Sequence, residues 1–599
     1  DATHFGPDAL VERQQAATIL ARALAASSLS SQSDAVLSGY KDQASIGSWA
    51  RAGLAFAAEH GVFSGNTGGE LRPADALNRG EAAKILDISV PEQLSPSQVK
   101  LTFLSLNDFH GHMYQDSKAR AGKDVGAARL TTAFFGEELG NPAGTVIVNA
   151  GDAFQGTTIS NLTQGQSVTE WLNFIGTDAM AVGNHEFDWT IDTLKQRIAD
   201  ARFPVLAANI YYEDSGKPVE WAKPYVIQDV NGVKVGYIGL ATPSSKTIVL
   251  PANVKNIEFR DPAPIVNALA PQVRAEGADV VVLLTHLAAA QDGPSGVSDE
   301  TGILLSHLTV PVDVVITGHS HTQVAALVNG IPVVQARSYG AAYGKIDLVY
   351  DKAQKKVVDT SVAVIQPSQA LAPNPTVGDI IKKWEGVIGP KTNEVVGKLA
   401  TTLTRTNTNA GESALGDLIA DEQRQATGAD IAFMNGGGIR ENIEAGDVTW
   451  GQLFSVQPFN NMLYTVQMTG QQVADFLENA VDIQYKNVNN LPGGHGPMQV
   501  SGLTYTWDYS KPFGQRVDVS SIKLDGGVAL DLTKEYTVAM NEFMVTGGDD
   551  LAVMKSIPAD KKIYTGIADL DALVNYFKAA TAPVSYELQN RITVVNFSK

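Results

Sequence analysis

The 599-residue sequence has no cysteine, which excludes disulfides, thiolate metal sites and a cysteine nucleophile. It also has no apolar run of about 18 residues, the length that a membrane-spanning helix needs. Basic residues are fewer than acidic ones, 45 against 64, and the resulting net charge of −19 disfavours binding to a nucleic-acid polymer. A small anionic substrate stays compatible with this charge if cations gather at one site.

The composition is that of an ordinary globular protein, 44% hydrophobic and 18% charged, which excludes a disordered or collagen-like chain. The length predicts about three to five domains. The chain begins at Asp1 with neither a methionine nor an apolar leader. We interpret this as a processed or truncated start from which any secretion signal has been removed.

An internal repeat lies in the first 90 residues. A shift that moves Arg13 onto Arg79 also superimposes a proline, a polar stretch and an Ala/Ile/Leu helix face. Between the two copies, residues 49–62 predict an amphipathic helix that ends at Gly61. With Gly-Val-Phe-Ser-Gly at 61–65 and Asn-Arg-Gly-Glu at 78–81, the pattern resembles surface-layer homology repeats, one whole and one partial. The resemblance implies binding to cell-wall polysaccharide and a secreted or cell-surface location in a bacterial envelope; the alternative is a generic helical appendage.

The hydrophobic pattern changes after a Pro- and Ser-containing linker at 90–98. Short apolar runs then alternate with helical stretches, which is typical of strands buried on both faces in an α/β domain. The runs are 101–106, 145–148, 179–182, 235–240, 280–284 and 312–316.

The pattern breaks again at 371–375. Residues 377–387 then predict one polar helix, which is our candidate for a hinge region, and a second mixed α/β domain with alternating runs such as 503–507 follows. We therefore predict repeats and linker over 1–95, the first α/β domain over 100–370, a linker helix over 371–392 and the second domain over 393–599.

Polar residues follow five of the apolar runs at the point where each ends. The groups are Asn-Asp-Phe-His at 107–110, Asn-Ala-Gly-Asp at 149–152, Gly-Asn-His-Glu at 183–186, Thr-His at 285–286 and Gly-His-Ser-His at 318–321. Ligands of open α/β sheets bind at the carboxyl ends of the strands, so we expect all five groups to meet at one such edge.

The chemistry of these groups fits two divalent cations. Imidazole, carboxylate and amide oxygen are suitable ligands for Zn²⁺, Mn²⁺ or Fe. Paired metals about 3.5–4 Å apart hold the attacking and leaving oxygens of a phosphoryl displacement. Each motif alone is a weak signal, because a lone Gly-x-His is more often a turn or a structural histidine, whereas the ordered set of five is specific.

Residues 101–321 resemble the calcineurin-like metallophosphoesterases. The resemblance implies that one metal is held by Asp108, His110, Asp152 and His321. It implies that the other is held by Asp152, Asn184, His286 and His319, with Asp152 as the bridge. His185 would be the catalytic histidine beside the phosphate, and Asp188 would orient it. The remaining histidines are interpreted as structural, and His112 is the nearest competitor.

The second domain carries three further segments of interest. Gly-Gly-Gly-Ile-Arg at 436–440 allows close approach of backbone to a ligand and offers the forked guanidinium of Arg440 to phosphate. Phe459 and Phe543 lie in Pro/Asn-rich and Gly-rich loops, where they serve either as core anchors or as stacking partners of a flat base. Asp549 follows a Gly-Gly turn and is a candidate acceptor for ribose hydroxyls.

Residues 100–599 as a whole resemble the 5′-nucleotidase family. The resemblance implies that Phe459 and Phe543 enclose the base and that Asp549 binds the ribose. Three residues would contact the base or line its pocket: Asn435, Asn461 and Gly494. Arg440 would bind phosphate, together with Arg405.

The resemblance also implies the fold and the function. We expect an α/β protein with a metallophosphoesterase β-sandwich flanked by helices, a second mixed α/β substrate-binding domain and a small helical repeat region. The implied activity is 5′-nucleotidase, extending to UDP-sugars and nucleoside di- and triphosphates. One alternative is a 2′,3′-cyclic-nucleotide phosphodiesterase with 3′-nucleotidase activity, a group that tends to have Asn in place of Asp188. The other alternative is a surface-layer protein with a vestigial enzyme domain.

Overall fold

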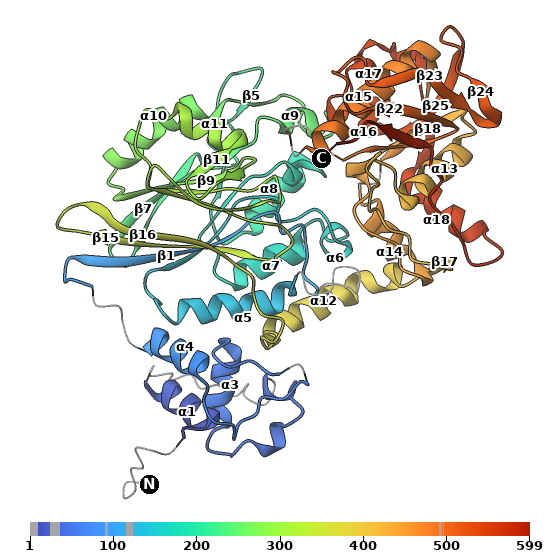
Figure 1. Ribbon diagram of the computed structural model, residues 1–599. Coiled ribbons are helices and arrows are strands. Elements are labelled where there is room, and N and C mark those ends of the chain that lie inside the picture. Colours follow the sequence, from blue (N-terminus) through green and yellow to red (C-terminus); the bar gives the residue numbers. More distant parts are fainter. Residues whose placement is uncertain are drawn as a thin grey trace, which may run out of the picture.

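The computed structural model describes residues 10–23, 36–66, 68–89, 94–115, 124–459, 461–489, 491, 494 and 496–598. Three parts follow one another along the chain: a small helical part, a large β-sandwich and a second α/β part (Figure 1). Residues 90–93 of the predicted linker, and much of the partial repeat before residue 36, lie outside the described residues.

The N-terminal part consists of short helices around a small apolar core. Its helices are α1 (Arg13–Ala23), α3 (Arg51–Glu59) and α4 (Arg79–Ser89). Gly61 follows α3 with a φ of 63°, as expected for a glycine that ends a helix. The buried guanidinium of Arg13 forms an ion pair with Glu81 and so joins the two repeat copies. Leu139 and Ala372 of the next part pack on this core, below α5 in Figure 1.

Two six-stranded sheets face each other in the central part. The first sheet has the order β16 (Lys356–Ile365), β15 (Tyr343–Asp351), β1 (Gln98–Leu106), β2 (Thr145–Asn149), β3 (Ala179–Ala181) and β4 (Val205–Leu206). The second has the order β13 (Gln323–Val328), β14 (Ile331–Ala336), β12 (Val314–Ile316), β9 (Val280–His286), β7 (Val233–Ala241) and β6 (Tyr225–Val230). The predicted strands are therefore present, and the expected β-sandwich is confirmed.

The strands that carry the five polar groups are divided between the two sheets. β1, β2 and β3 are parallel neighbours in the first sheet, and β9 and β12 are parallel neighbours in the second. The expectation of one open sheet edge was wrong in this respect. An apolar run shows that a strand is buried on both faces, but it does not show which sheet the strand joins.

Apolar residues fill the space between the sheets and the layers outside them. Phe103, Val148, Tyr237 and Leu284 belong to the inner layer. The helices α5 (Gly126–Glu138), α7 (Gln166–Phe174) and α8 (Ile191–Asp200) cover the first sheet, and α12 (Pro375–Thr392) packs on α5 and α7. The helices α10 (Pro262–Ala275) and α11 (Asp299–His307) cover the second. Each fully buried large side chain contributes about 1.5–3 kcal/mol, so this core fixes the strand ends that hold the polar groups.

The helix predicted over 377–387 is present and longer, because α12 spans Pro375–Thr392. Asn374 caps its N-terminus by accepting a hydrogen bond from the backbone N–H of Val377, and Pro375 occupies the first turn. The helix runs along the base of the sandwich and leads to the C-terminal part (Figure 1).

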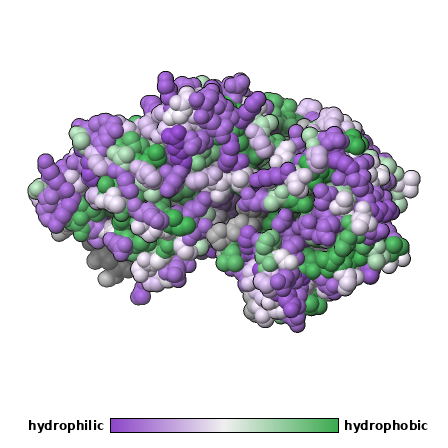
Figure 2. Space-filling view, turned by 90° about the horizontal axis from the view of Figure 1, so that it is seen from above, coloured by the Kyte–Doolittle hydropathy of each residue, from purple (hydrophilic) through white to green (hydrophobic). Residues whose placement is uncertain are grey.

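The C-terminal part is a second mixed α/β fold, as expected. Its larger sheet has the order β21 (Met498–Ser501), β18 (Ile431–Asn435), β25 (Glu535–Asn541), β20 (Met462–Thr469) and β26 (Lys562–Ala568). A smaller sheet contains β24 (Val528–Ala529), β23 (Val517–Leu524), β22 (Leu503–Asp508) and β27 (Ile592–Val595). The main helices are α13 (Ala414–Thr427), α15 (Gly470–Val488) and α18 (Asp569–Ala579). Seen from above, the surface is mostly hydrophilic and is indented between two lobes (Figure 2).

No helix in the described ranges combines the length and the apolar character needed to cross a bilayer.

Candidate active site

The five predicted polar groups meet at one end of the sandwich, where strands of both sheets terminate. Five of the seven predicted metal ligands have left-handed backbone conformations there: Asp108, His110, Asp152, His319 and His321, with φ between 49° and 78°. Such conformations cost on the order of 1–3 kcal/mol each in non-glycine residues and cluster at functional sites. The tight turns after the strands therefore serve to direct side chains toward a common point.

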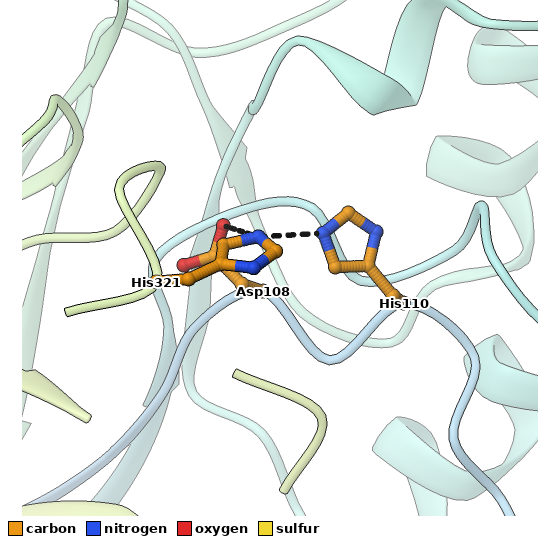
Figure 3. A group of neighbouring side chains, drawn as sticks. All are labelled: Asp108, His110 and His321. Carbon is orange, nitrogen blue, oxygen red and sulfur yellow. Dashed lines mark hydrogen bonds and ion pairs between the residues drawn. The ribbon is translucent and has the colours of Figure 1, made fainter. Parts of the chain in front are cut away.

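The first group consists of Asp108, His110 and His321 (Figure 3). Nε2 of His321 lies 3.1 Å from Nε2 of His110 and 3.4 Å from Oδ1 of Asp108. Two imidazole nitrogens and one carboxylate oxygen thus converge, although the residues come from the loops after β1 and β12.

The second group consists of Asp152, His286 and His319, whose ligand atoms lie within 4.8 Å of one another. Nε2 of His286 is 3.1 Å from Oδ2 of Asp152 and 3.2 Å from Oδ1 of Asn184. Asn184 therefore joins this group, as the predicted ligand set requires.

Asp152 lies between the two groups. Its Oδ2 atom is 3.1 Å from Nε2 of His286 and 3.8 Å from Nε2 of His110. Burial alone would raise the pKa of Asp152, but His286, His185 and His110 outweigh it and hold the pKa well below its usual value. An ionised carboxylate in this place is suited to bridge two cations.

Backbone carbonyls set the orientation of the imidazoles. Nδ1 of His110 lies 2.7 Å from the carbonyl oxygen of Gln155, and Nδ1 of His286 lies 2.7 Å from that of Ala150. An Nδ1–H that donates to a carbonyl leaves Nε2 as the electron-pair donor, which is the arrangement seen around metal-bound histidines. The donor set therefore fits two divalent cations.

Glu186 supports the site, and its role was not predicted from the sequence. Its buried carboxylate accepts hydrogen bonds from the backbone N–H groups of Asp152, Ala153 and Gly183, at 2.7–2.8 Å. Burial and the charge of Asp152 raise the pKa of Glu186 to about 7. Its place beside His185 in Gly-Asn-His-Glu was the available signal, but the sequence does not show that the side chain turns inward to the backbone.

His185 and Asp188 form a hydrogen-bonded pair at the edge of the ligand groups. Nδ1 of His185 lies 2.5 Å from Oδ2 of Asp188, and the backbone N–H of His185 donates to Oδ1 of Asp152. Burial would lower the pKa of His185, but Asp188 and Asp152 outweigh it, and the net shift is upward. His185 also lies within ligand distance of His110 and Asp152.

His112, the other histidine considered for the site, is separated from the ligand groups by the ring of Tyr339. Nδ1 of His112 is 3.1 Å from Oδ2 of Asp124, and its ring stacks on Tyr339 at 4.3 Å. Tyr339 in turn is 5.6 Å from the ring of His110 and 5.3 Å from that of His321. Tyr339 thus separates His112 from the site, a contact that no sequence pattern indicated.

One cavity of about 680 Å³ joins this region to the C-terminal part. Asp108, His110 and His286 are buried beneath it, and the other predicted ligands line it. All eight predicted substrate residues also line it: Arg405, Asn435, Arg440, Phe459, Asn461, Gly494, Phe543 and Asp549. A volume of this size holds a small organic ligand.

Hydrogen bonds to neighbouring side chains hold Asn435 and Asp549 in place. Asn541 donates to Oδ1 of Asn435 at 2.9 Å, and Asn435 donates to Oδ2 of Asp549 at 3.2 Å. The glycine before Asp549 is required, because a Cβ on Gly548 would lie 2.5 Å from the ring of Phe543. The ring of Phe543 therefore packs directly against the backbone next to Asp549.

The two candidate arginines lie together beside Phe459. The guanidinium of Arg440 is 5.8 Å from the ring of Phe459, and Arg405 donates to the carbonyl oxygen of Arg440 at 2.6 Å. Burial is the main cause of the low pKa of His110, and the charges of His185, His321 and, least of these, Arg440 lower it further. Arg440 lines the same cavity as Asp152 and Asn184 of the ligand groups.

A close backbone approach explains the glycine at position 494. A Cβ there would lie 2.7 Å from the backbone of Asn487 in α15. Residues 492, 493 and 495 of the same predicted loop lie outside the described residues.

Direct contacts join the two parts around the cavity. Oγ1 of Thr158 lies 2.6 Å from Oγ of Ser455, and Asn161 donates to the carbonyl oxygen of Pro458 at 3.4 Å. The short helix α9 (Ser245–Ile248) also lies against the turn η6 (Gly548–Asp550). The two parts are thus in direct contact, and residues of both line the cavity.

Models of three known domain families match the chain. The calcineurin-like phosphoesterase model matches residues 101–323, the model of the 5′-nucleotidase C-terminal domain matches 388–556, and the S-layer homology domain model matches 39–83.

Known proteins resemble most of the chain. "Endonuclease YhcR" of Bacillus subtilis is 33% identical over 528 residues, which cover 84% of this chain and 42% of that protein. "Trifunctional nucleotide phosphoesterase protein YfkN" of the same organism is 29% identical over 85% of this chain and 36% of its own length. The chain therefore spans less than half of these two relatives. The crystal structure of a 5′-nucleotidase precursor from Thermus thermophilus is 28% identical and superimposes with a TM-score of 0.71, covering 84% of this chain and all of that one.

Proposed function

Because the chain belongs to the 5′-nucleotidase family, we propose that it is a metal-dependent phosphoester hydrolase that releases phosphate from nucleoside 5′-monophosphates. UDP-sugars and nucleoside di- and triphosphates are further candidate substrates. One observation carries the proposal. Two groups of side chains that could hold a metal ion line or lie beneath one cavity. The same cavity is lined by two aromatic rings, an arginine and the carboxylate of Asp549.

Two divalent cations at the ligand groups would supply a nucleophile derived from water and would neutralise charge on the phosphate. Asp108, His110, Asp152 and His321 would hold one of them, and Asp152, Asn184, His286 and His319 would hold the other. Asp152 is suited to the shared role by its position between the groups.

The chain's own residues then position and polarise the substrate. Phe459 and Phe543 stack on the base, and Asp549 accepts hydrogen bonds from the ribose. The guanidinium of Arg440 binds the phosphate. Protonated Nε2 of His185 faces the phosphoryl group and stabilises charge on it or on the leaving 5′-oxygen, while Asp188 keeps Nδ1 protonated and oriented.

A panel of phosphate esters tests this function directly. Purified protein with Mn²⁺ is expected to release phosphate from 5′-AMP faster than from 3′-AMP or 2′,3′-cyclic AMP. A faster reaction with 3′-AMP or the cyclic ester would favour the alternative phosphodiesterase and 3′-nucleotidase activity. The absence of turnover with every substrate and every restored metal would favour a vestigial enzyme domain.

We further propose that the N-terminal part binds cell-wall polysaccharide and holds the enzyme at the cell surface. The match of residues 39–83 to the S-layer homology domain supports this location. Sedimentation with purified cell-wall fragments is the test: the full chain is expected in the pellet, and a chain that begins at residue 94 is expected in the supernatant. Equal sedimentation of the two would contradict the proposal.

A further inference from the structure

Residues 244–253, here called the 244–253 segment, form a wall of the cavity that no sequence motif indicated. The segment follows β7 of the phosphoesterase domain and includes α9. Four of its side chains line the cavity: Ser244, Ile248, Leu250 and Asn253. Two of these four, Ile248 and Leu250, are large aliphatic side chains, and they lie in the same cavity as the aromatic rings of Phe459 and Phe543.

The 244–253 segment is firmly anchored. The hydroxyl of Ser244 donates to Oε1 of Glu300 at 3.1 Å, and the ammonium of Lys246 donates to the carbonyl oxygen of Ile257 at 2.8 Å. Val249 is 1% exposed and belongs to the core of the sandwich. Because its start, its middle and its helix are all held, the segment presents Ile248 and Leu250 in fixed positions.

The 244–253 segment lies near Phe543 and Asp549, the residues proposed to bind the base and the ribose. α9 lies against η6, the turn that carries Asp549 beside Phe543, where the green and orange parts of Figure 1 meet. The C-terminal part thus supplies the aromatic and carboxylate side of the pocket, and the phosphoesterase domain supplies an aliphatic side. Ribose and phosphate are polar, so the base is the part of a nucleotide that gains from aliphatic contact.

We propose that Ile248 and Leu250 contact the nucleobase and act as specificity-determining residues contributed by the phosphoesterase domain. The inference rests on the proposed function, because it assigns these contacts to a nucleotide in that cavity. Base recognition then depends on both parts of the molecule, and a nucleotide is held fully only when α9 and η6 are in contact.

Asn253 connects the 244–253 segment to the His185–Asp188 pair, so displacement of the segment can be told apart from loss of a base contact. Its amide donates to the carbonyl oxygen of Asp188 at 2.9 Å, and Asp188 holds His185. A variant that displaces the whole segment would therefore disturb the His185–Asp188 pair and slow the hydrolysis of every phosphate ester. A variant that removes only base contact would not.

The test compares 5′-AMP with ribose 5-phosphate, which has the same ester and sugar but no base. In Ile248→Ala and Leu250→Ala, KM for 5′-AMP is expected to rise about tenfold, the effect of lost aliphatic contact in a binding pocket. The kinetic constants for ribose 5-phosphate are expected to stay unchanged. Ala252→Ser, at an exposed position of the same segment, is the matched control and is expected to leave both substrates unaffected.

An unchanged KM for 5′-AMP in both variants would overturn the inference, and so would an equal loss with the two substrates. Calorimetric binding of adenosine, which has no phosphate, separates this inference from the proposed function. Suppose that the wild-type protein hydrolyses no nucleotide, but that Leu250→Ala binds adenosine about tenfold more weakly than the wild type does. The proposed function would then be wrong, while the contact of Leu250 with the base would be supported. If the wild type and Leu250→Ala bind adenosine with the same affinity, Leu250 does not contact the base and the inference is wrong.

Discussion

The rings of His185 and Phe459 lie 6.3 Å apart, although the two residues come from different parts of the chain. His185 belongs to the loop after β3 of the sandwich, and Phe459 follows α14 (Trp450–Val456) in the C-terminal part. A base that stacks on Phe459 would therefore place its own 5′-phosphate close to the His185–Asp188 pair. Under the proposed function, base binding and phosphate cleavage would therefore take place in the same cavity.

Metal removal is the simplest test of the ligand groups. Treatment with EDTA followed by dialysis is expected to abolish phosphate release, and addition of Mn²⁺ or Zn²⁺ is expected to restore it. The buried, ionised Asp108 and Asp152 would lose their compensating charge, so the melting temperature is expected to fall as well. Full activity after complete metal removal, verified by elemental analysis, would contradict the assignment.

His185 is expected to act on the phosphoryl group rather than to hold a metal. His185→Ala should reduce kcat by about 10²–10⁴-fold, the usual effect of losing a positioned acid, base or charge stabiliser. Its metal content should equal that of the wild type. His112→Ala, separated from the site by Tyr339, is the control and should retain kcat. Loss of bound metal in His185→Ala would show that His185 is a ligand.

The pH dependence should report on Asp188. Burial lowers the pKa of His185, but the Asp188 and Asp152 carboxylates raise it by more, so removing one charge in Asp188→Asn should lower this pKa. If protonated His185 is the active form, the rate falls as the pH rises through the pKa. The alkaline limb of kcat/KM against pH should therefore move to lower pH in Asp188→Asn and stay in place in the exposed control Asp192→Asn. An unmoved limb would exclude this role.

The aromatic pair should affect binding more than chemistry. Phe459→Ala and Phe543→Ala are each expected to raise KM for 5′-AMP about 5- to 160-fold, because stacking on one face of a base contributes about 1–3 kcal/mol. The effect on kcat should be smaller. Phe513→Ala, at a position that is 56% exposed and outside the set of lining residues, is the control. Unchanged KM values in both site variants would remove the pair from base recognition.

A buried carboxylate inside the C-terminal part, Asp417 of α13, should make the stability of the protein pH-dependent. Burial and the neighbouring Glu412 raise the pKa of Asp417 to about 8, well above its value of about 3.9 in an unfolded chain. The folded state then binds the extra proton between these values, so stability is full at low pH and is lost as the pH rises toward about 8. When the pH is raised from 6 to 9, the melting temperature of Asp417→Asn should fall by less than that of the wild type. Each kcal/mol of difference in the free energy of unfolding corresponds to about 2–4 °C. An equal loss in the two proteins would contradict this.

The sequence was sufficient to predict the strands and the convergence of their polar groups. Apolar runs followed by Asp108, His110 or His286 can be read directly, because a buried strand must end where its polar residues begin. The same was true of the helix that begins at Pro375. The metal-ligand and substrate roles of the individual residues remain predictions.

Other features depend on three-dimensional contacts that leave no local pattern. The carboxylate of Glu186 turns toward the backbone of Asp152, and Tyr339 is inserted between His112 and the ligand groups. The aliphatic wall formed by Ile248 and Leu250 depends on how α9 meets η6, some 300 residues later in the chain. Residues so far apart in the sequence are related only through the packing of two folded parts.

Anomalous X-ray diffraction from crystals soaked in Mn²⁺ would test the shared carboxylate most directly. We predict two peaks per chain, about 3.5–4 Å apart, on either side of the Asp152 carboxylate. A single peak, or two peaks of which only one contacts Asp152, would contradict the account.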